Sequence, residues 1–352
     1  MLLEENKLLA PFTSFQIGGP ARWFVEARTE EEVVEAAGWA RERGVALFVL
    51  GGGSNLLVSD AGFGGMVLHI ALSGVDARPA QDLSYQIIYR VGAGEDWDRF
   101  VSRTVNDNCA GIECLAGIPG TAGGTPVQNV GAYGQEVATT IDRVRAFDLK
   151  QERFVEFTSA ECGFAYRHSR FNTADRDRFV VTRVDYRLAK GGSPAFRYAE
   201  LQRAFSGGVK PTLNDVSALV RQIRRSKGML IEEDVADCRS AGSFFKNPIL
   251  NVEQVARIEA ESGMQPPRFP AGPELENAGC LKVSAAWLIE QAGFTKGYAM
   301  GAASVSTLHT LALVNRGGAT AQDILALADR IRSSVEQRFG IQLETEPVLV
   351  GF

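Results

Sequence analysis

Two glycine-rich segments decide the fold that this sequence predicts. Residues 49–60 read VLGGGSNLLVSD, and residues 116–136 read AGIPGTAGGTPVQNVGAYGQE. Because glycine has no side chain, backbone N–H groups in such turns approach an anion closely and together form an anion-binding concavity. A diphosphate bridge fits such a concavity, so both segments are candidate phosphate-binding loops. The alternative interpretation is that they are tight turns between packed strands.

Neither segment has the pattern of a common nucleotide-binding fold. The first lacks the third glycine and the following helix of a dinucleotide-binding fingerprint. The second lacks the preceding strand and an acid at the expected distance, and it also lacks the Gly-Lys-Ser/Thr of a P-loop. We therefore expect a nucleotide cofactor that is held by a different fold.

The rest of the chain indicates a mixed α+β protein. Thr29 is a typical helix N-cap, because three glutamates follow it and apolar residues then recur at helical spacing up to Gly44. The remaining pattern predicts strands at 46–50, 85–94 and 178–188, a hairpin at 143–157, helices at 95–108, 213–226, 320–339 and from Ser284, and a final strand at 341–352. The stretch 189–211, with glycine pairs near both ends, predicts a linker or a mobile loop.

Composition limits the classes of function. The chain has 352 residues, a net charge of −5 and a longest basic patch at residues 224–227, which argues against nucleic-acid binding. The N-terminus lacks the pattern of a signal peptide, and no apolar stretch approaches about 18 residues, so we expect no membrane span. The five cysteines form no C-x-x-C pair and the three histidines are far apart, so we expect no metal site, no disulfide framework and a cytoplasmic location.

The chain resembles the UDP-N-acetylenolpyruvoylglucosamine reductase (MurB) family in a series of segments that occur in the same order. These segments are FTSFQIGGPA (12–21), the two glycine-rich segments, CGFAYRHSRF (162–171), GSFFKNP (242–248), SAAWLIEQAG (284–293), GAASVSTLHTLALVN (301–315) and LETEPVLVG (343–351). The resemblance implies an FAD-binding fold of the vanillyl-alcohol-oxidase (PCMH) type, followed by a separate α+β substrate-binding domain.

The resemblance also implies a domain plan. The first FAD-binding lobe spans 1–70, the second spans 71–190, and the substrate-binding domain spans 191–340. The substrate domain includes a tyrosine-bearing loop at 191–211, and the C-terminal strand at 341–352 is a candidate to return to the active site.

The implied reaction has two halves and belongs to peptidoglycan precursor synthesis. NADPH first reduces bound FAD, and the reduced flavin then passes a hydride to C3 of the enolpyruvyl ether of UDP-N-acetylglucosamine. Negative charge develops at C2 and spreads into the carboxylate. A proton added at C2 then gives UDP-N-acetylmuramate.

Three residues match the catalytic positions of the family. Arg167 corresponds to the group that grips the carboxylate of the intermediate, with Arg170 as its less favoured neighbour. Glu346 corresponds to the glutamate that stabilises the intermediate, with Glu344 as the alternative on the same side of the strand. Ser243 corresponds to the proton donor, and a weak acid suffices there because a carbanion or enolate is a strong base.

The resemblance also assigns binding residues. The cofactor set is Gly51, Gly52, Gly53, Ser54, Asn55, Gly117, Ile118, Pro119, Gly120, Gly124, Gln128, Asn129, Gly131, Ala132 and Tyr133. The substrate set is Tyr198, Lys227, Asn247 and His309. Lys246 and Lys227 are both candidates for tuning the acidity of Ser243.

Two other functions stay open at this point. An FAD-dependent oxidase of a small alcohol or sugar could use the same fold, although the glycine loops carry no His or Cys for covalent flavin attachment. A non-catalytic nucleotide-binding module is the other alternative. The sequence leaves the oligomeric state open, with a monomer favoured.

Overall fold

The computed structural model describes residues 1–83, 85–206, 208, 210–232, 235–269, 271, 275 and 278–352. The chain forms two compact units. Unit 1 comprises Met1–Lys7, Ala21–Gly53 and Gly64–Arg225, and unit 2 comprises Leu8–Pro20, Ser54–Phe63 and Ser226–Phe352. The predicted bracketing glycine Gly207 lies outside the described residues.

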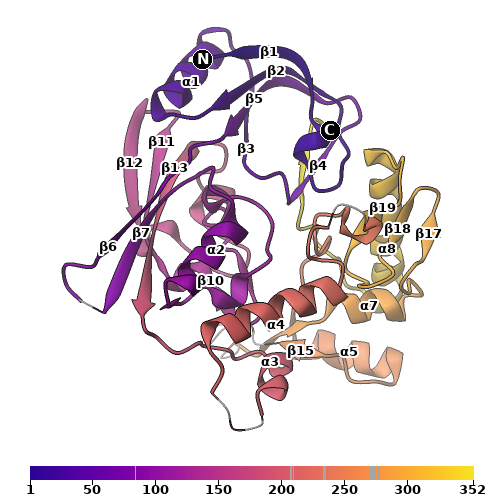
Figure 1. The fold of residues 1–352 in the computed structure, drawn as a ribbon. Coiled ribbons are helices and arrows are strands. Elements are labelled where there is room, and N and C mark those ends of the chain that lie inside the picture. Colours follow the sequence, from indigo (N-terminus) through magenta and orange to yellow (C-terminus); the bar gives the residue numbers. More distant parts are fainter. Residues whose placement is uncertain are drawn as a thin grey trace. The chain divides into compact units, whose positions relative to one another are not determined.

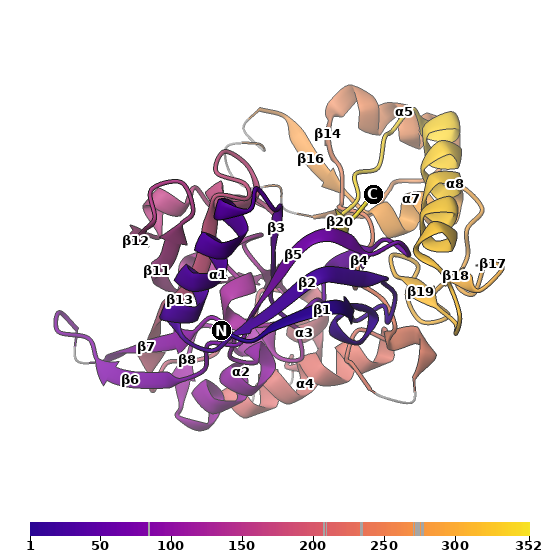
Figure 2. The same ribbon diagram turned by 90° about the horizontal axis from the view of Figure 1, so that it is seen from above.

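Two larger sheets form the framework of the described part of unit 1 (Figures 1 and 2). The first has the strand order β1 (Leu3–Leu8), β2 (Pro20–Ala27), β5 (Phe63–Ile70) and β3 (Leu47–Leu50), and β3 runs parallel to β5. The second has the order β12 (Arg153–Thr158), β11 (Ile141–Asp148), β13 (Phe179–Lys190), β7 (Gln86–Gly92) and β6 (Val75–Pro79), with β8 (Cys109–Ala110) also paired to β13. The strands of the second sheet are antiparallel.

The first helix of unit 1 forms where its sequence predicts it. Helix α1 (Glu30–Glu42) begins after Thr29, whose side chain accepts a hydrogen bond from the Glu32 N–H at 3.3 Å. The acids of its first turn stabilise the positive end of the helix dipole. Its buried residues, Val33, Ala36 and Ala40, share one apolar core with β2 and β5.

The hairpin predicted at 143–157 is also confirmed. Strands β11 and β12 pair from Arg143 opposite Thr158 to Asp148 opposite Arg153. The Asp148 side chain accepts hydrogen bonds from the N–H groups of Lys150 and Gln151, which closes the turn.

Residues 191–225 pack in unit 1, whereas the sequence placed them in the substrate domain. The stretch predicted as a linker contains a helix, α3 (Ala199–Ala204), because Leu201 is fully buried in the core of unit 1. Helix α4 (Leu213–Ser226) has the predicted limits, and Val216 and Val220 on its apolar stripe enter the same core. Unit 1 also contains helix α2 (Trp97–Asn106) and a short hairpin of β9 (Gly131–Ala132) and β10 (Gln135–Glu136).

The described part of unit 2 combines small sheets with helices. Strands β14 (Ile249–Asn251), β16 (Cys280–Val283) and β15 (Arg268–Phe269) form one sheet, and β17 (Ala299–Met300), β18 (Ala303–Val305) and β19 (Leu313–Asn315) form another. Strand β4 (Leu56–Val58) pairs in parallel with β20 (Val348–Val350). The helices with described bounds are α5 (Val252–Ser262), α7 (Ala285–Gln291) and α8 (Ala321–Phe339), and Figure 1 shows α8 beside β18 and β19.

Helix α8 and the C-terminal segment brace unit 2. Thr320 and Asp323 form a capping box at the start of α8, and Gly340 ends the helix with a φ of 68°. Asp60 accepts a hydrogen bond from the Ala321 N–H at 2.8 Å. The predicted strand at 341–352 is too long, because regular pairing is confined to Val348–Val350 and a bridge at Thr345.

Candidate active site

The predicted site residues fall into two groups, one in each unit. In unit 1 the two glycine loops meet. A Cβ atom on Gly52 would lie 2.5 Å from Gly120 Cα, and one on Gly51 would lie 2.9 Å from the Thr121 hydroxyl oxygen. Gly53 and Gly117 have φ values of 61° and 72°, in the left-handed region that favours glycine. The loops therefore need glycine for mutual packing as well as for approach by a ligand.

The meeting point of the loops also offers groups to a bound anion. The Thr121 hydroxyl is buried and has no hydrogen-bond partner in the described part of the chain. A buried hydroxyl without a partner is costly, so it calls for a ligand or water. A Cβ on Gly124 would meet nothing within 4 Å, which leaves space beside the loop. These features fit a diphosphate-bearing cofactor. Thr121 is a candidate cofactor-binding residue that the sequence analysis did not name, although it directly follows Gly120.

Some predicted cofactor residues have structural partners. Asn129 is buried, and its amide nitrogen donates to a Glu136 carboxylate oxygen and to the Ala165 carbonyl, both at 3.0 Å. Its amide oxygen accepts from the Ala138 N–H at 3.1 Å. The side chain of Asn129 therefore joins three segments of the protein, and we attribute to it the positioning of the loop.

Arg167 lies in a tight turn next to the β9–β10 hairpin. Its φ is 55°, and its Nη1 atom donates to the Gly131 carbonyl at 3.0 Å. Tyr133, at the tip of the same hairpin, packs edge-on against Tyr198 with ring centroids 5.3 Å apart. The structure thus brings the predicted carboxylate-binding arginine, a predicted cofactor residue and the predicted substrate tyrosine to one hairpin of unit 1.

The neighbouring Arg170 has a different environment. Its Nε and Nη2 atoms both donate to Asp175, at 2.9 and 2.6 Å, and its guanidinium lies 4.0 Å from the centroid of the Phe157 ring. This arginine also lowers the pKa of Asp175. Arg170 is therefore committed to an ion pair and a cation–π contact, which supports the choice of Arg167.

In unit 2, Ser243 sits on a backbone that is fixed by its neighbours. The Phe244 carbonyl accepts from the Glu346 N–H at 2.9 Å, and Phe245 forms a β-bridge with Thr345. The rings of Phe244 and Phe245 are buried in the core of unit 2. The two phenylalanines after the serine thus anchor the segment, and the antiparallel register brings Ser243 close to Glu346.

The two candidate glutamates differ in their surroundings. Glu344 is exposed and forms a 3.2 Å ion pair with Lys246. Glu346 is half-buried, and its carbonyl accepts from the Asn55 side chain at 3.2 Å. Asn55 also accepts from the Val348 N–H at 2.9 Å through its own carbonyl. The predicted cofactor residue Asn55 therefore holds the glutamate strand in unit 2.

Asn247 has a structural hydrogen bond. Its side-chain oxygen accepts from the Ala285 N–H at 2.9 Å, at the start of α7, where Ser284 is the N-cap. Since a helix start leaves several N–H groups without intrahelical partners, this bond stabilises α7 and orients the loop that follows Ser243.

His309 lies in a positively charged environment. Burial, together with the nearby charges of Lys227 and Lys296, lowers its pKa to about 4. The turn before His309 is held by Asp237, which accepts from Ser306 Oγ at 2.6 Å and from the Thr307 N–H at 2.7 Å. Two ammonium groups around a neutral imidazole suit a phosphate group, and Lys296 is a second candidate that the sequence alone did not indicate.

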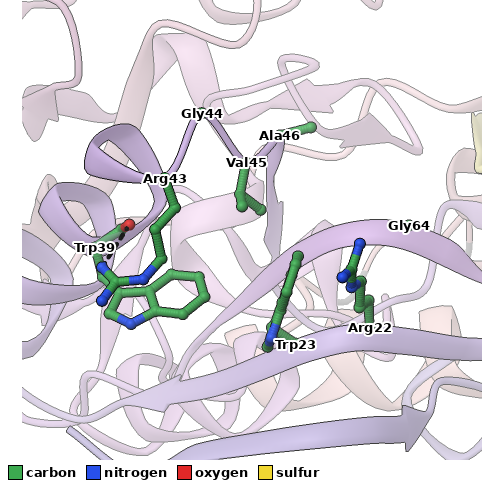
Figure 3. A pocket seen from close by; sticks show the side chains of 8 residues that line it. All are labelled: Arg22, Trp23, Trp39, Arg43, Gly44, Val45, Ala46 and Gly64. Carbon is green, nitrogen blue, oxygen red and sulfur yellow. Dashed lines mark hydrogen bonds between the residues drawn. The ribbon is translucent and has the colours of Figure 1, made fainter.

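One open hollow of unit 1 contains none of the predicted site residues (Figure 3). Arg22 lies over the Trp23 ring at 4.1 Å and Arg43 over the Trp39 ring at 4.4 Å, while the two indoles meet at 5.5 Å. The described residues include no helix long and apolar enough to cross a membrane. Over the same ranges, no group of three or more His, Cys, Asp or Glu side chains is arranged to hold a metal ion.

Comparison with known proteins identifies the family. A family model for an FAD binding domain matches residues 21–156, and the model for the C-terminal domain of UDP-N-acetylenolpyruvoylglucosamine reductase matches residues 233–350. The chain is 46% identical to the UDP-N-acetylenolpyruvoylglucosamine reductase of Streptomyces coelicolor, over 97% of this chain and 89% of that protein. The chain belongs to the UDP-N-acetylenolpyruvoylglucosamine reductase family.

Other members of this reductase family agree. The reductase of Thermobifida fusca is 44% identical over 98% of this chain and 97% of its own length. The crystal structure of the Thermus caldophilus reductase superposes with a TM-score of 0.68 at 26% identity, covering 99% of this chain and all of that one. The predicted family and the predicted α+β class with an FAD-binding fold are confirmed.

The matched regions divide the predicted residues. The predicted cofactor residues, from Gly51 to Tyr133, all lie within the FAD binding match, and Ser243, Asn247, His309 and Glu346 lie within the C-terminal match. Arg167, Tyr198 and Lys227 lie between the two matches.

Proposed function

We propose that the protein is an FAD-containing oxidoreductase that uses NADPH to reduce UDP-N-acetyl-3-O-(1-carboxyvinyl)-glucosamine to UDP-N-acetylmuramate, a step of peptidoglycan precursor synthesis. The observation that carries this proposal is membership of the reductase family over nearly the whole chain, with an FAD binding domain at residues 21–156. Because all five cysteines are free thiols in the structure, we propose that the protein acts in a reducing cytoplasm. As a separate proposal, we favour a monomer.

The residues of unit 1 would hold the cofactor through the two glycine loops. Gly51–Gly53, Ile118 and Gly120 would offer backbone N–H groups, and the Thr121 hydroxyl adds a donor that has no hydrogen-bond partner among the described residues. The chemistry that FAD would supply there, once reduced by NADPH, is a hydride for C3 of the enolpyruvyl group.

The developing negative charge needs fixed positive and hydrogen-bonding groups. We propose that the guanidinium of Arg167 binds the carboxylate of the intermediate. The hydrogen bond from Arg167 to the Gly131 carbonyl fixes the turn that carries this arginine. Glu346 is assigned to stabilise the intermediate, since Glu344 is exposed and paired with Lys246. We assign to Ser243 the donation of the proton to C2, and its backbone is anchored by the two buried phenylalanines that follow it.

Further residues would bind the sugar nucleotide. Lys227, Lys296 and neutral His309 form a group suited to its diphosphate. Tyr198 would contribute a contact from unit 1, and Asn247 would act by holding the Ser243 loop against α7.

Product analysis in heavy water tests the proposal. In heavy water the protein, FAD, NADPH and the enolpyruvyl sugar nucleotide should give UDP-N-acetylmuramate that carries solvent deuterium at C2. Rapid oxygen consumption with a small alcohol or sugar, and no turnover of the enolpyruvyl compound, would instead favour the oxidase.

A further inference from the structure

Gly117, in the second glycine loop, forms hydrogen bonds to side chains of other residues through both its N–H and its carbonyl group. Its N–H donates to a carboxylate oxygen of Asp98 on α2, and its carbonyl accepts from Nε of Arg224 on α4 at 2.9 Å. The φ of Gly117 is 72°, and glycine adopts positive and negative φ values about equally well. The residue itself therefore does not determine this conformation, and its hydrogen-bond partners do. Two helices therefore determine the direction in which the loop leaves residue 117.

The carboxylate of Asp98 is fixed in turn. Arg221, one turn before Arg224 on α4, donates through Nη1 to the second oxygen of Asp98. Its Nη2 atom donates to the Ser102 hydroxyl of α2 at 2.7 Å. Figures 1 and 2 show α4 alongside α2, and these ionic contacts join the two helices beneath the loop.

Arg224 is an unusual residue to find in this position. Its side chain is only 8% exposed, although arginine is rarely buried without a specific partner. Burial lowers its pKa, while Tyr133 and Asp98 act in the opposite direction. Since Tyr133 packs against Tyr198, one guanidinium supports both the glycine loop and the tyrosine pair.

Helix α4 (213–226) lies outside both matched family regions, which end at residue 156 and begin at residue 233. We propose that α4 nevertheless completes the cofactor-binding domain, and that Asp98, Arg221 and Arg224 are positioning residues that set the Gly117 peptide before FAD binds. A loop fixed in its binding conformation binds more tightly, because less ordering accompanies association. This inference rests on the proposed FAD-dependent function.

The test is a titration of the apo-protein with FAD, in which binding is measured by the quenching of flavin fluorescence. Arg224→Met removes the donor to Gly117 and should weaken FAD binding about 10- to 100-fold, the effect of losing one charge-assisted hydrogen bond. Arg221→Gln should weaken it about 3- to 10-fold by releasing Asp98. At saturating FAD, flavin reduction by NADPH should stay within about threefold of wild type.

Arg178→Met is the matched control, since Arg178 pairs at 2.8 Å with the buried Asp148 on a hairpin of the same unit. It should lower the melting temperature and leave FAD affinity unchanged. Wild-type affinity in both Arg224→Met and Arg221→Gln would overturn the inference while leaving the proposed function intact. If Arg224→Met does not fold, the Arg221→Gln titration decides alone. A wild-type protein that takes up no FAD would overturn the proposed function itself.

Discussion

His309 gives the sharpest quantitative prediction of the structure. Burial together with Lys227 and Lys296 lowers its pKa from 6.5 to about 4. An unfolded histidine takes up a proton as the pH falls through about 6.5, but the folded protein does not. The free energy of unfolding should therefore be unaffected by His309 above pH 6.5 and fall by about 1.4 kcal/mol per pH unit below it. The full loss by pH 4 is about 3 kcal/mol.

The assay is NMR of protein labelled in its three histidines, with His309→Gln used to assign the resonance. The His309 ring should titrate near pH 4. Urea unfolding between pH 6 and pH 5 should show a smaller pH slope in His309→Gln than in wild type, by about 1.4 kcal/mol per pH unit. His168→Gln, at an exposed position, is the matched control for the replacement of one histidine by glutamine. A His309 ring that titrates near pH 6.5 would refute the reasoning.

The same group reports on the proposed diphosphate site. The charge of UDP-N-acetylglucosamine is constant over this pH range, so its binding beside Lys227 and Lys296 should raise the pKa of His309 by offsetting the two ammonium charges. Affinity for this nucleotide sugar should then increase as the pH falls from 7 to 5. An unchanged His309 titration in the saturated complex would place the diphosphate elsewhere.

Other substitutions test single features. Ser243→Ala should leave flavin reduction by NADPH intact and slow the following half-reaction by about 10²- to 10⁴-fold in stopped-flow mixing, and equal losses in both would indicate a structural role. Gly52→Ala should cost about 1–3 kcal/mol in urea unfolding, because its Cβ would meet Gly120 Cα at 2.5 Å, whereas Gly124→Ala should be neutral. Thr121→Val should weaken FAD binding about tenfold without destabilising the apo-protein, and a stability loss would mean that the hydroxyl has a protein partner.

Local patterns allowed much of the fold to be predicted. The limits of α4 follow from its apolar stripe, and those of α8 from the Thr320 cap and Gly340. An apolar stripe shows only that one face of a helix is buried and not which element covers it. The packing of α4 in unit 1 therefore could not be predicted from the sequence. The same holds for α3, because six residues between glycine-rich stretches carry too little periodicity to indicate a helix.

The candidate site shows the corresponding limit. Arg167, Ser243 and Glu346 came from short motifs, whereas Thr121 and Lys296 depend on neighbours that are distant in sequence. Likewise, the partners of the Asn129 and Asn247 side chains include groups 36 and 38 residues away. A polar side chain in a glycine-rich or turn segment resembles a ligand contact until its tertiary hydrogen bonds are known.

The visible absorption spectrum of the purified protein tests the central claim most directly. We predict a flavin spectrum that is bleached by NADPH without oxygen and restored when the enolpyruvyl sugar nucleotide is added. A colourless protein that takes up no FAD, or a reduced flavin that this compound does not reoxidise, would contradict the proposed function.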